Sequence, residues 1–89
     1  MNVKDAVKCA ITNVAELFQN ETITNLGLEE VEYSDGQWLI TVGFSRPWDY
    51  PQDFSLANMV KELPKRNYKI VTINDQNQKL IAIKNRNIT

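Results

Sequence analysis

One stretch decides the fold of this chain: Ser34-Asp35-Gly36-Gln37-Trp38-Leu39-Ile40-Thr41-Val42-Gly43-Phe44-Ser45. Its first four residues are typical of a β-hairpin turn, in which Gly36 is free to take a positive φ. From Trp38 to Ser45 the side chains alternate. Such alternation predicts a half-buried strand, with Trp38, Ile40, Val42 and Phe44 on the core side.

The strand before this turn is expected at residues 26–33. Leu26 and Leu28 have one parity, whereas Val31 and Tyr33 have the other. A change of parity within one strand predicts a β-bulge, here near Glu29-Glu30.

Upstream of this hairpin, residues 2–18 have the pattern of an amphipathic helix. Apolar residues recur at the spacing of one helix face: Val3, Ala6, Val7, Ala10, Ile11, Val14, Leu17 and Phe18. This periodicity predicts a helix that begins after an Asn2 N-cap and ends at Phe18 or Gln19.

Two further strands are predicted downstream, at residues 68–73 and 79–84, with a turn at 74–78. Both strands carry apolar residues on each parity. One parity must meet the helix. The other is expected to leave an apolar surface on the open sheet face, which needs the connector or another molecule to cover it.

The 45–65 connector joins the two hairpins, and connections this long in small domains are often functional. Aromatic residues and arginine favour an interaction surface, which we place at Arg46, Pro47, Trp48, Asp49, Tyr50 and Phe54. The alternative is a lid in which Trp48 and Phe54 fold over the open face. Ser55 is a suitable cap for a short helix that would end before Pro64.

The predicted fold class is α+β, in a single domain of residues 1–89. The element order is helix, two strands, a short helix or loop, and two more strands. We expect a four-stranded antiparallel meander with the N-terminal helix packed on one face.

Composition argues against catalysis. The chain has no histidine and one cysteine, which removes the commonest general base, internal disulfides and Cys–His metal sites. For Cys9, a structural role in the core is favoured. Glu29, Glu30 and Glu32 are expected to form a solvated edge of the sheet. For Asp49 and Asp53, roles in turns or caps are favoured over cation binding. No enzyme, metal or cofactor is predicted.

Charge is distributed unevenly. Residues 1–45 hold two basic and seven acidic residues, and residues 46–89 hold eight basic and four acidic ones. Such asymmetry can indicate an oriented protein partner or nucleic acid. Nucleic acid is disfavoured because the basic residues are scattered and the chain is acidic overall: Lys61, Lys65, Arg66, Lys69, Lys79, Lys84 and Arg86. No signal peptide or membrane span is evident, so a cytoplasmic location is expected.

The layout resembles the cystatin-like and PepSY-like group of small α+β domains. The resemblance lies in Asp35-Gly36 before Trp38-Leu39-Ile40-Thr41-Val42, and in the ending Tyr68-Lys69-Ile70-Val71-Thr72-Ile73-Asn74-Asp75. The phrase Leu28-Glu29-Glu30-Val31-Glu32, with Trp38 through Pro47-Trp48 after it, also resembles small uncharacterised bacterial proteins. A helix followed by hairpins is more weakly similar to gas-vesicle accessory proteins.

The resemblance implies a binding or regulatory role rather than catalysis. Cystatins inhibit papain-like proteases through a Gln-x-Val-x-Gly segment in the first hairpin and Pro-Trp in the last. Here Gln37-Trp38-Leu39-Ile40-Thr41 does not match, and Pro47-Trp48 lies in the connector. Protease inhibition is therefore not supported.

The predicted function is a non-enzymatic interaction or regulatory module, self-associating as a homodimer through the open sheet face and the connector. Two alternatives stay open: a domain that binds a small molecule or peptide, and an inhibitor or immunity-type protein that binds an enzyme.

Overall fold

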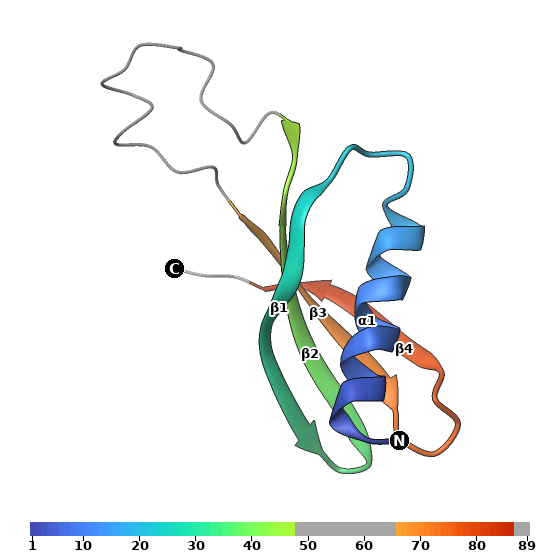
Figure 1. Ribbon diagram of the computed structural model, residues 1–89. Coiled ribbons are helices and arrows are strands. Elements are labelled where there is room, and N and C mark those ends of the chain that lie inside the picture. The colour runs from blue at the N-terminus through green and yellow to red at the C-terminus, as the bar shows by residue number, and fades with distance from the viewer. Residues whose placement is uncertain (48–65, 87–89) are drawn as a thin grey trace.

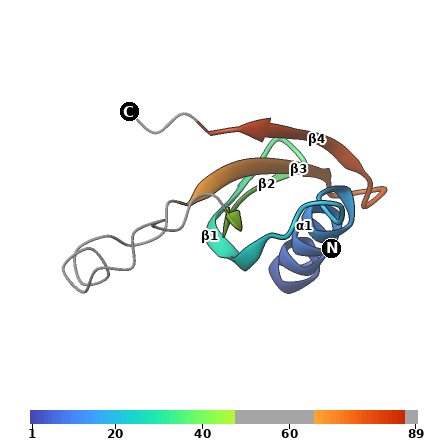
Figure 2. The same ribbon diagram turned by 90° about the horizontal axis from the view of Figure 1, so that it is seen from above.

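The computed structural model describes residues 1–47 and 66–86. Helix α1 (Val3–Leu17) is followed by strands β1 (Thr24–Ser34), β2 (Gln37–Ser45), β3 (Asn67–Asn74) and β4 (Leu80–Asn85). The strands form one antiparallel sheet in the order β1-β2-β3-β4. Figures 1 and 2 show α1 lying against one face of this curved sheet. The predicted α+β meander is confirmed; the predicted short helix after Ser55 lies outside the described residues.

Helix α1 begins after Asn2 as its pattern predicts and ends at Leu17, one residue before the predicted Phe18. The Asn2 side chain accepts a hydrogen bond of 2.8 Å from the Asp5 backbone N–H and so caps the first turn. The face toward the sheet buries Ala6, Ala10 and Val14 completely. Two of these three side chains are alanines, so the helix can approach the sheet closely.

The core lies between α1 and the middle strands. Ile40, Val42 and Phe44 of β2 are fully buried, as are Val71 and Ile73 of β3. The alternation along β2 therefore predicted the correct inner face. Burying one such side chain contributes about 1.5–3 kcal/mol to stability.

The predicted bulge is present in β1. Leu28 pairs with Val42 and Glu30 pairs with Thr41, which leaves Glu29 as the extra residue. The bulge puts Val31 and Tyr33 on the helix side, opposite Ile40 and Trp38 of β2.

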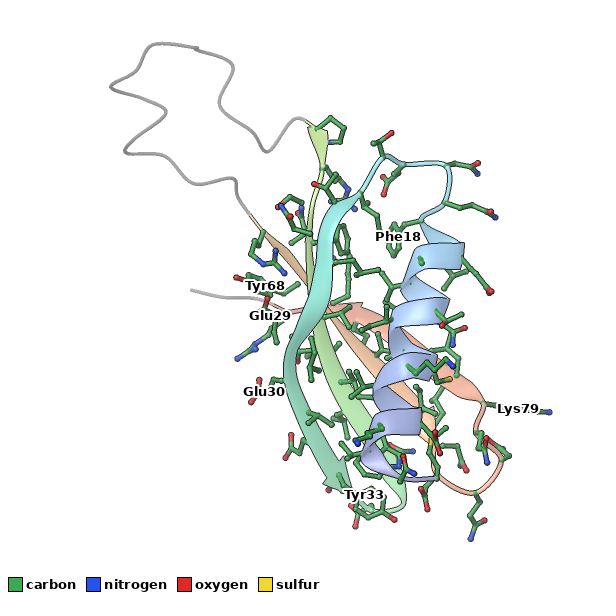
Figure 3. The ribbon with its side chains drawn as sticks, viewed as in Figure 1. Phe18, Glu29, Glu30, Tyr33, Tyr68 and Lys79 are labelled. Atoms are coloured by element: carbon green, nitrogen blue, oxygen red, sulfur yellow. The ribbon has the colours of Figure 1, made fainter. Side chains whose placement is uncertain are left out.

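Both Glu29 and Glu30 lie on the open face as a result. Glu30 pairs with Thr41, and the Glu29 carboxylate lies where a side chain on Gly43 would project. A regular strand would place Glu29 and Glu30 on opposite faces, and the bulge removes that difference. Figure 3 shows both side chains projecting from β1 away from α1.

The β1–β2 turn has the geometry of a type I′ hairpin. Asp35 and Gly36 both have positive φ, at 50° and 73°. The turn between β3 and β4 is held by the Asn74 side chain, whose Oδ1 accepts from the backbone N–H groups of Gln76 and Asn77. In both turns the conformation is determined by residues of the turn itself.

The exposed large apolar side chains do not gather on the open face. Leu39 and Ile70, which face that side, are half-buried. The exposed ones in the described part of the chain are Val3, Leu17, Leu28, Val31, Tyr33 and Ile81. Five of these belong to α1 and β1, so the exposed apolar side chains lie mainly along a different margin from the predicted open face.

Candidate functional site

Two of the six predicted interaction residues fall in the described part of the chain. Arg46 is largely buried: its guanidinium lies 5.1 Å from the Phe44 ring centroid and 5.8 Å from that of Phe18. Its Nε donates to the Glu21 carboxylate at 3.3 Å. Pro47 is exposed. Arg46 therefore holds elements of the fold together. The other four lie outside the described residues: Trp48, Asp49, Tyr50 and Phe54.

All three arginines of the chain form ion pairs with glutamates of the acidic first half. The pairs are Arg46–Glu21 at 3.3 Å, Arg66–Glu29 at 2.8 Å and Arg86–Glu30 at 2.9 Å. Ion pairs within one molecule therefore balance part of the charge difference between the two halves of the sequence. It does not by itself require an oppositely charged partner.

The Arg66–Glu29 pair lies over Gly43. A Cβ atom on Gly43 would come within 2.7 Å of the Arg66 Nη2 and 2.9 Å of the Glu29 Oε1. Arg66 also donates through Nη1 to the Asn25 carbonyl at 3.0 Å. The glycine therefore leaves room on β2 for a link between the start of β3 and the bulge of β1.

The Arg86–Glu30 pair spans the sheet. Arg86 directly follows β4, and Glu30 belongs to β1 at the opposite edge. Neighbouring strands are about 4.8 Å apart, so the two side chains together cover about 14 Å of sheet width. The curvature visible in Figure 2 shortens that path. Together with Arg66–Glu29, this pair places polar groups across the open face.

A basic cavity of about 610 Å³ lies at the connector end of the sheet. It forms at the end of the β3–β4 pairing, where Lys69 pairs with Asn85 and the Arg86 backbone N–H donates to the Tyr68 carbonyl at 3.1 Å. Its cationic lining residues are Arg46, Arg66, Lys69 and Arg86. Of the basic residues considered in the sequence, Arg66, Lys69 and Arg86 contribute to this lining, but from different faces: Lys69 lies on the helix side opposite Val42, whereas Arg66 and Arg86 pair with Glu29 and Glu30 on the open side.

The other predicted basic residues do not join this cavity. Lys79 lies at the far end of the β3–β4 hairpin from Tyr68 (Figure 3). Lys84 does not line the cavity. Lys61 and Lys65 fall outside the described residues.

Lys69 is the electrostatically unusual member of the cavity. Its ammonium donates to the Asn85 Oδ1 and lies 5.6 Å from the Phe18 ring centroid. Partial burial, and next the positive charge of Arg46, lower the pKa of Lys69 below its ordinary value of 10.5; the Glu21 carboxylate opposes this. The folded protein therefore holds this cation in an unfavourable position.

A second surface, the α1–β1 groove, was not anticipated from the sequence. It has a volume of about 560 Å³, and apolar side chains of α1 and β1 line it, including Val3, Val7, Ile11 and Leu28. Lys4 and Lys8 also line it. Exposed Val31 and Tyr33 continue the apolar strip along β1. The parity change between Leu28 and Val31 predicted the bulge of β1 but not the exposure of these side chains.

Cys9 is half-buried and packs against the core, as expected for a structural cysteine. The Asn13 side-chain amide donates to its carbonyl oxygen at 2.8 Å and contacts its Sγ at 3.4 Å. Over residues 1–47 and 66–86, no group of three or more His, Cys, Asp or Glu side chains is placed to hold a metal ion. Asp49 and Asp53 lie outside this part.

The sequence matches no protein-family model, no curated protein and no solved structure at a significant level. The cystatin-like and PepSY-like resemblance therefore stays a prediction, supported by layout alone. Within the described part of the chain, no helix is long and apolar enough to cross a membrane.

Proposed function

We propose that this protein is a non-enzymatic interaction module that self-associates through the α1–β1 groove and the adjoining edge of β1. One observation carries the proposal: four of the six exposed large apolar side chains in the described residues share this margin, namely Val3, Leu28, Val31 and Tyr33. Clustered apolar exposure beside a strand edge is typical of an association surface.

The two edges of the sheet differ in their suitability for pairing. In β1 the residues from Glu30 to Ser34 follow a regular register with β2. In contrast, β4 has six residues, a register shift opposite Thr72–Ile73, and Lys84 near its end. Shortness, bulges and lysines protect an edge from pairing, so β1 is the favoured edge.

The proposed occupant is a second copy of this chain. Antiparallel pairing of two β1 edges about a two-fold axis would extend the sheet and bring together two identical apolar strips. Leu28, Val31 and Tyr33 of each copy would then be partly buried on the helix side. The contact is self-complementary without any additional segment.

This location differs from the open face predicted from the sequence. On that face, the Arg66–Glu29 and Arg86–Glu30 pairs would have to lose solvent on association, at a cost in desolvation. The α1–β1 groove needs no such change. A contribution of the connector through Trp48 stays a prediction, which loss of dimer mass in a Trp48→Ala variant would support.

The test compares two variants of equal chemistry on opposite edges. Val31→Lys puts a charge on the β1 strip, whereas Ile81→Lys makes the same change at an exposed position of β4. Light scattering coupled to gel filtration should give a concentration-dependent dimer for wild type and Ile81→Lys, and a monomer for Val31→Lys. A monomeric wild type at all concentrations, or equal loss in both variants, would refute the proposal.

A further inference from the structure

We infer that a second copy of the chain pairs with β1 in one register, in which the backbone of Val31 bonds to that of the partner's Tyr33 and the two Glu32 residues lie opposite each other. This register rests on the self-association proposed above. It adds the residues whose backbones form the contact and the side chain that limits its strength. Both follow from the alternation of hydrogen bonds along β1.

The β1–β2 turn determines where this alternation begins. Asp35 and Gly36 form a two-residue turn with positive φ at both positions, and Ser34 pairs with Gln37. The two residues that flank such a turn exchange a pair of backbone hydrogen bonds. The Gly36 carbonyl points the other way and accepts a hydrogen bond of 3.0 Å from the Asp75 backbone N–H, at the end of β3. That contact agrees with the same alternation on the far side of β2.

The alternation leaves the backbone groups of Val31 and Tyr33 facing the free edge. Hydrogen-bonded and non-hydrogen-bonded pairs follow each other along an antiparallel ladder. Because the backbone of Ser34 bonds to β2, that of Glu32 does so as well, whereas the N–H and C=O groups of Val31 and Tyr33 point outward. The bulge at Glu29 interrupts this order further along the strand.

This segment of β1 is open to a partner strand. All residues from 29 to 35 are exposed, whichever face of the strand they occupy. Figure 1 shows the arrowhead end of β1 at the outer margin of the sheet, with α1 lying toward the middle strands. A second strand can therefore approach this edge without displacing the helix.

Two-fold symmetry and the outward-facing residues restrict the pairing. A symmetric antiparallel contact that bonds these residues has its axis at Val31, Glu32 or Tyr33. An axis at Glu32 joins Val31 to the partner's Tyr33 on both sides of the axis, so two pairs exchange hydrogen bonds. An axis at Val31 or Tyr33 keeps one such pair, because the next would fall on the bulge residue Glu29 or the turn residue Asp35. The Glu32 register therefore satisfies the most backbone groups.

On the helix side, this register adds an apolar contact. Val31 and Tyr33 are 36% and 52% exposed, and each would lie opposite the other residue of the partner. Pairs of a β-branched and an aromatic side chain stabilise neighbouring strands. The Tyr33 ring already packs edge-on against Trp38, with ring centroids 4.9 Å apart. A side chain that is ordered in this way loses less entropy on association.

On the open face, the register brings two like charges together. The two Glu32 residues form a non-hydrogen-bonded pair, in which the Cα atoms lie about 4.5 Å apart. Among the described residues Glu32 forms no ion pair, unlike Glu29 and Glu30. The repulsion weakens association about two- to fivefold, which is less than the additional pair of hydrogen bonds contributes. Glu32 therefore limits the strength of the dimer without changing its register, as charges on strand edges commonly do.

Disulfide cross-linking of the full chain distinguishes the registers. Glu32→Cys, Val31→Cys and Tyr33→Cys are made in a Cys9→Ala background, which removes the one native cysteine. A disulfide spans about 4.4–6.8 Å between Cα atoms. In the inferred register only position 32 meets its own copy within that range, since positions 31 and 33 each lie about 7–8 Å from theirs. Glu32→Cys should therefore cross-link about tenfold faster than the other two variants.

The other outcomes separate failure of the register from failure of self-association. Ile81→Cys, at an exposed position of β4, gives the background rate. Fastest cross-linking at position 31 or 33 would overturn the register. Background rates in all three variants, with a wild type that is dimeric by light scattering, would overturn strand pairing but not self-association. A monomeric wild type would refute the self-association on which the register rests.

Glu32→Gln provides a second test that does not depend on cross-linking. It should lower the dimer dissociation constant about two- to fivefold at low salt, because it removes the repulsion at the axis. Glu16→Gln makes the same change in net charge at an exposed position of α1 that does not line the α1–β1 groove, and it should leave the constant unchanged. Equal effects of the two variants would overturn the placement of Glu32 at the axis.

Discussion

Arg66 and Glu29 meet above Gly43, with the guanidinium Nη2 2.8 Å from the carboxylate Oε1. The two residues are far apart in sequence. Gly43 of β2 lies beneath the pair and has no side chain that would separate the two charged groups. Both are partly exposed, so the pair contributes a modest coupling free energy. Its importance is positional, because it joins the β1 bulge to the start of β3.

A double-mutant cycle tests this relationship. Arg66→Gln and Glu29→Gln, alone and together, should give a coupling of about 0.2–1 kcal/mol in chemical denaturation. In a Gly43→Ala background the coupling should fall close to zero, since the new methyl group occupies the space of the pair. An unchanged coupling in that background would show that the pair does not need the glycine.

The three arginines should differ in their contribution to stability. Arg46 is the least exposed of them and packs on two aromatic rings as well as binding Glu21. Arg46→Met should therefore lower the free energy of unfolding by about 1–3 kcal/mol. Arg86→Met should lower it by about 0–1 kcal/mol. Urea titrations at equal salt provide the comparison, and the reverse order would contradict the packing described for Arg46.

Lys69 makes the stability of the fold depend on pH. Its pKa is lower in the folded state, so the unfolded chain binds more protons between that value and 10.5. Stability attributable to Lys69 therefore rises with pH across this window, and its unfavourable charge acts fully at neutral pH.

Lys69→Met should accordingly raise the thermal midpoint at pH 7, and its advantage over wild type should shrink as the pH approaches 10.5. Lys79→Met is the control because Lys79 is exposed and lies in the connection between β3 and β4. If Lys69→Met lowers the midpoint at pH 7 by more than the control does, the contacts with Phe18 and Asn85 outweigh the charge penalty.

Salt should strengthen the proposed dimer. Glu32 is exposed and pairs with Leu39 on the open side of β1. Antiparallel pairing of two β1 edges brings the Glu32 carboxylates onto one face of the joined sheet, where they repel. The dimer dissociation constant should fall between 50 and 500 mM salt (roughly fivefold), and Glu32→Gln should reduce this dependence. A dimer weakened by salt would instead indicate attraction between charges of opposite sign.

The local features of the fold were predictable from the sequence. Asn2 and the apolar spacing of α1 act within a few turns, and Asp35-Gly36 determines its hairpin with the residues beside it. The β1 bulge followed from a parity change between Leu28 and Val31. In each case the residues that determine the structure lie within the short segment that adopts it, so the sequence pattern alone is enough to predict it.

The candidate sites were less predictable because they depend on distant pairing. Arg86 and Glu30 come together only when the four strands are in register. The basic cavity depends in the same way on the pairing of β3 with the end of β4. Likewise, Leu28 and Val31 have the same apolar character as core residues. Only the position of α1 leaves them exposed.

Amide hydrogen exchange at two protein concentrations tests the location of the proposed interface most directly. Above the association threshold, amides of residues 30–34 in β1 should exchange more slowly than in dilute solution, while those of residues 80–85 in β4 should be unchanged. Slower exchange in β4, or no concentration dependence in β1, would contradict an interface at the β1 edge.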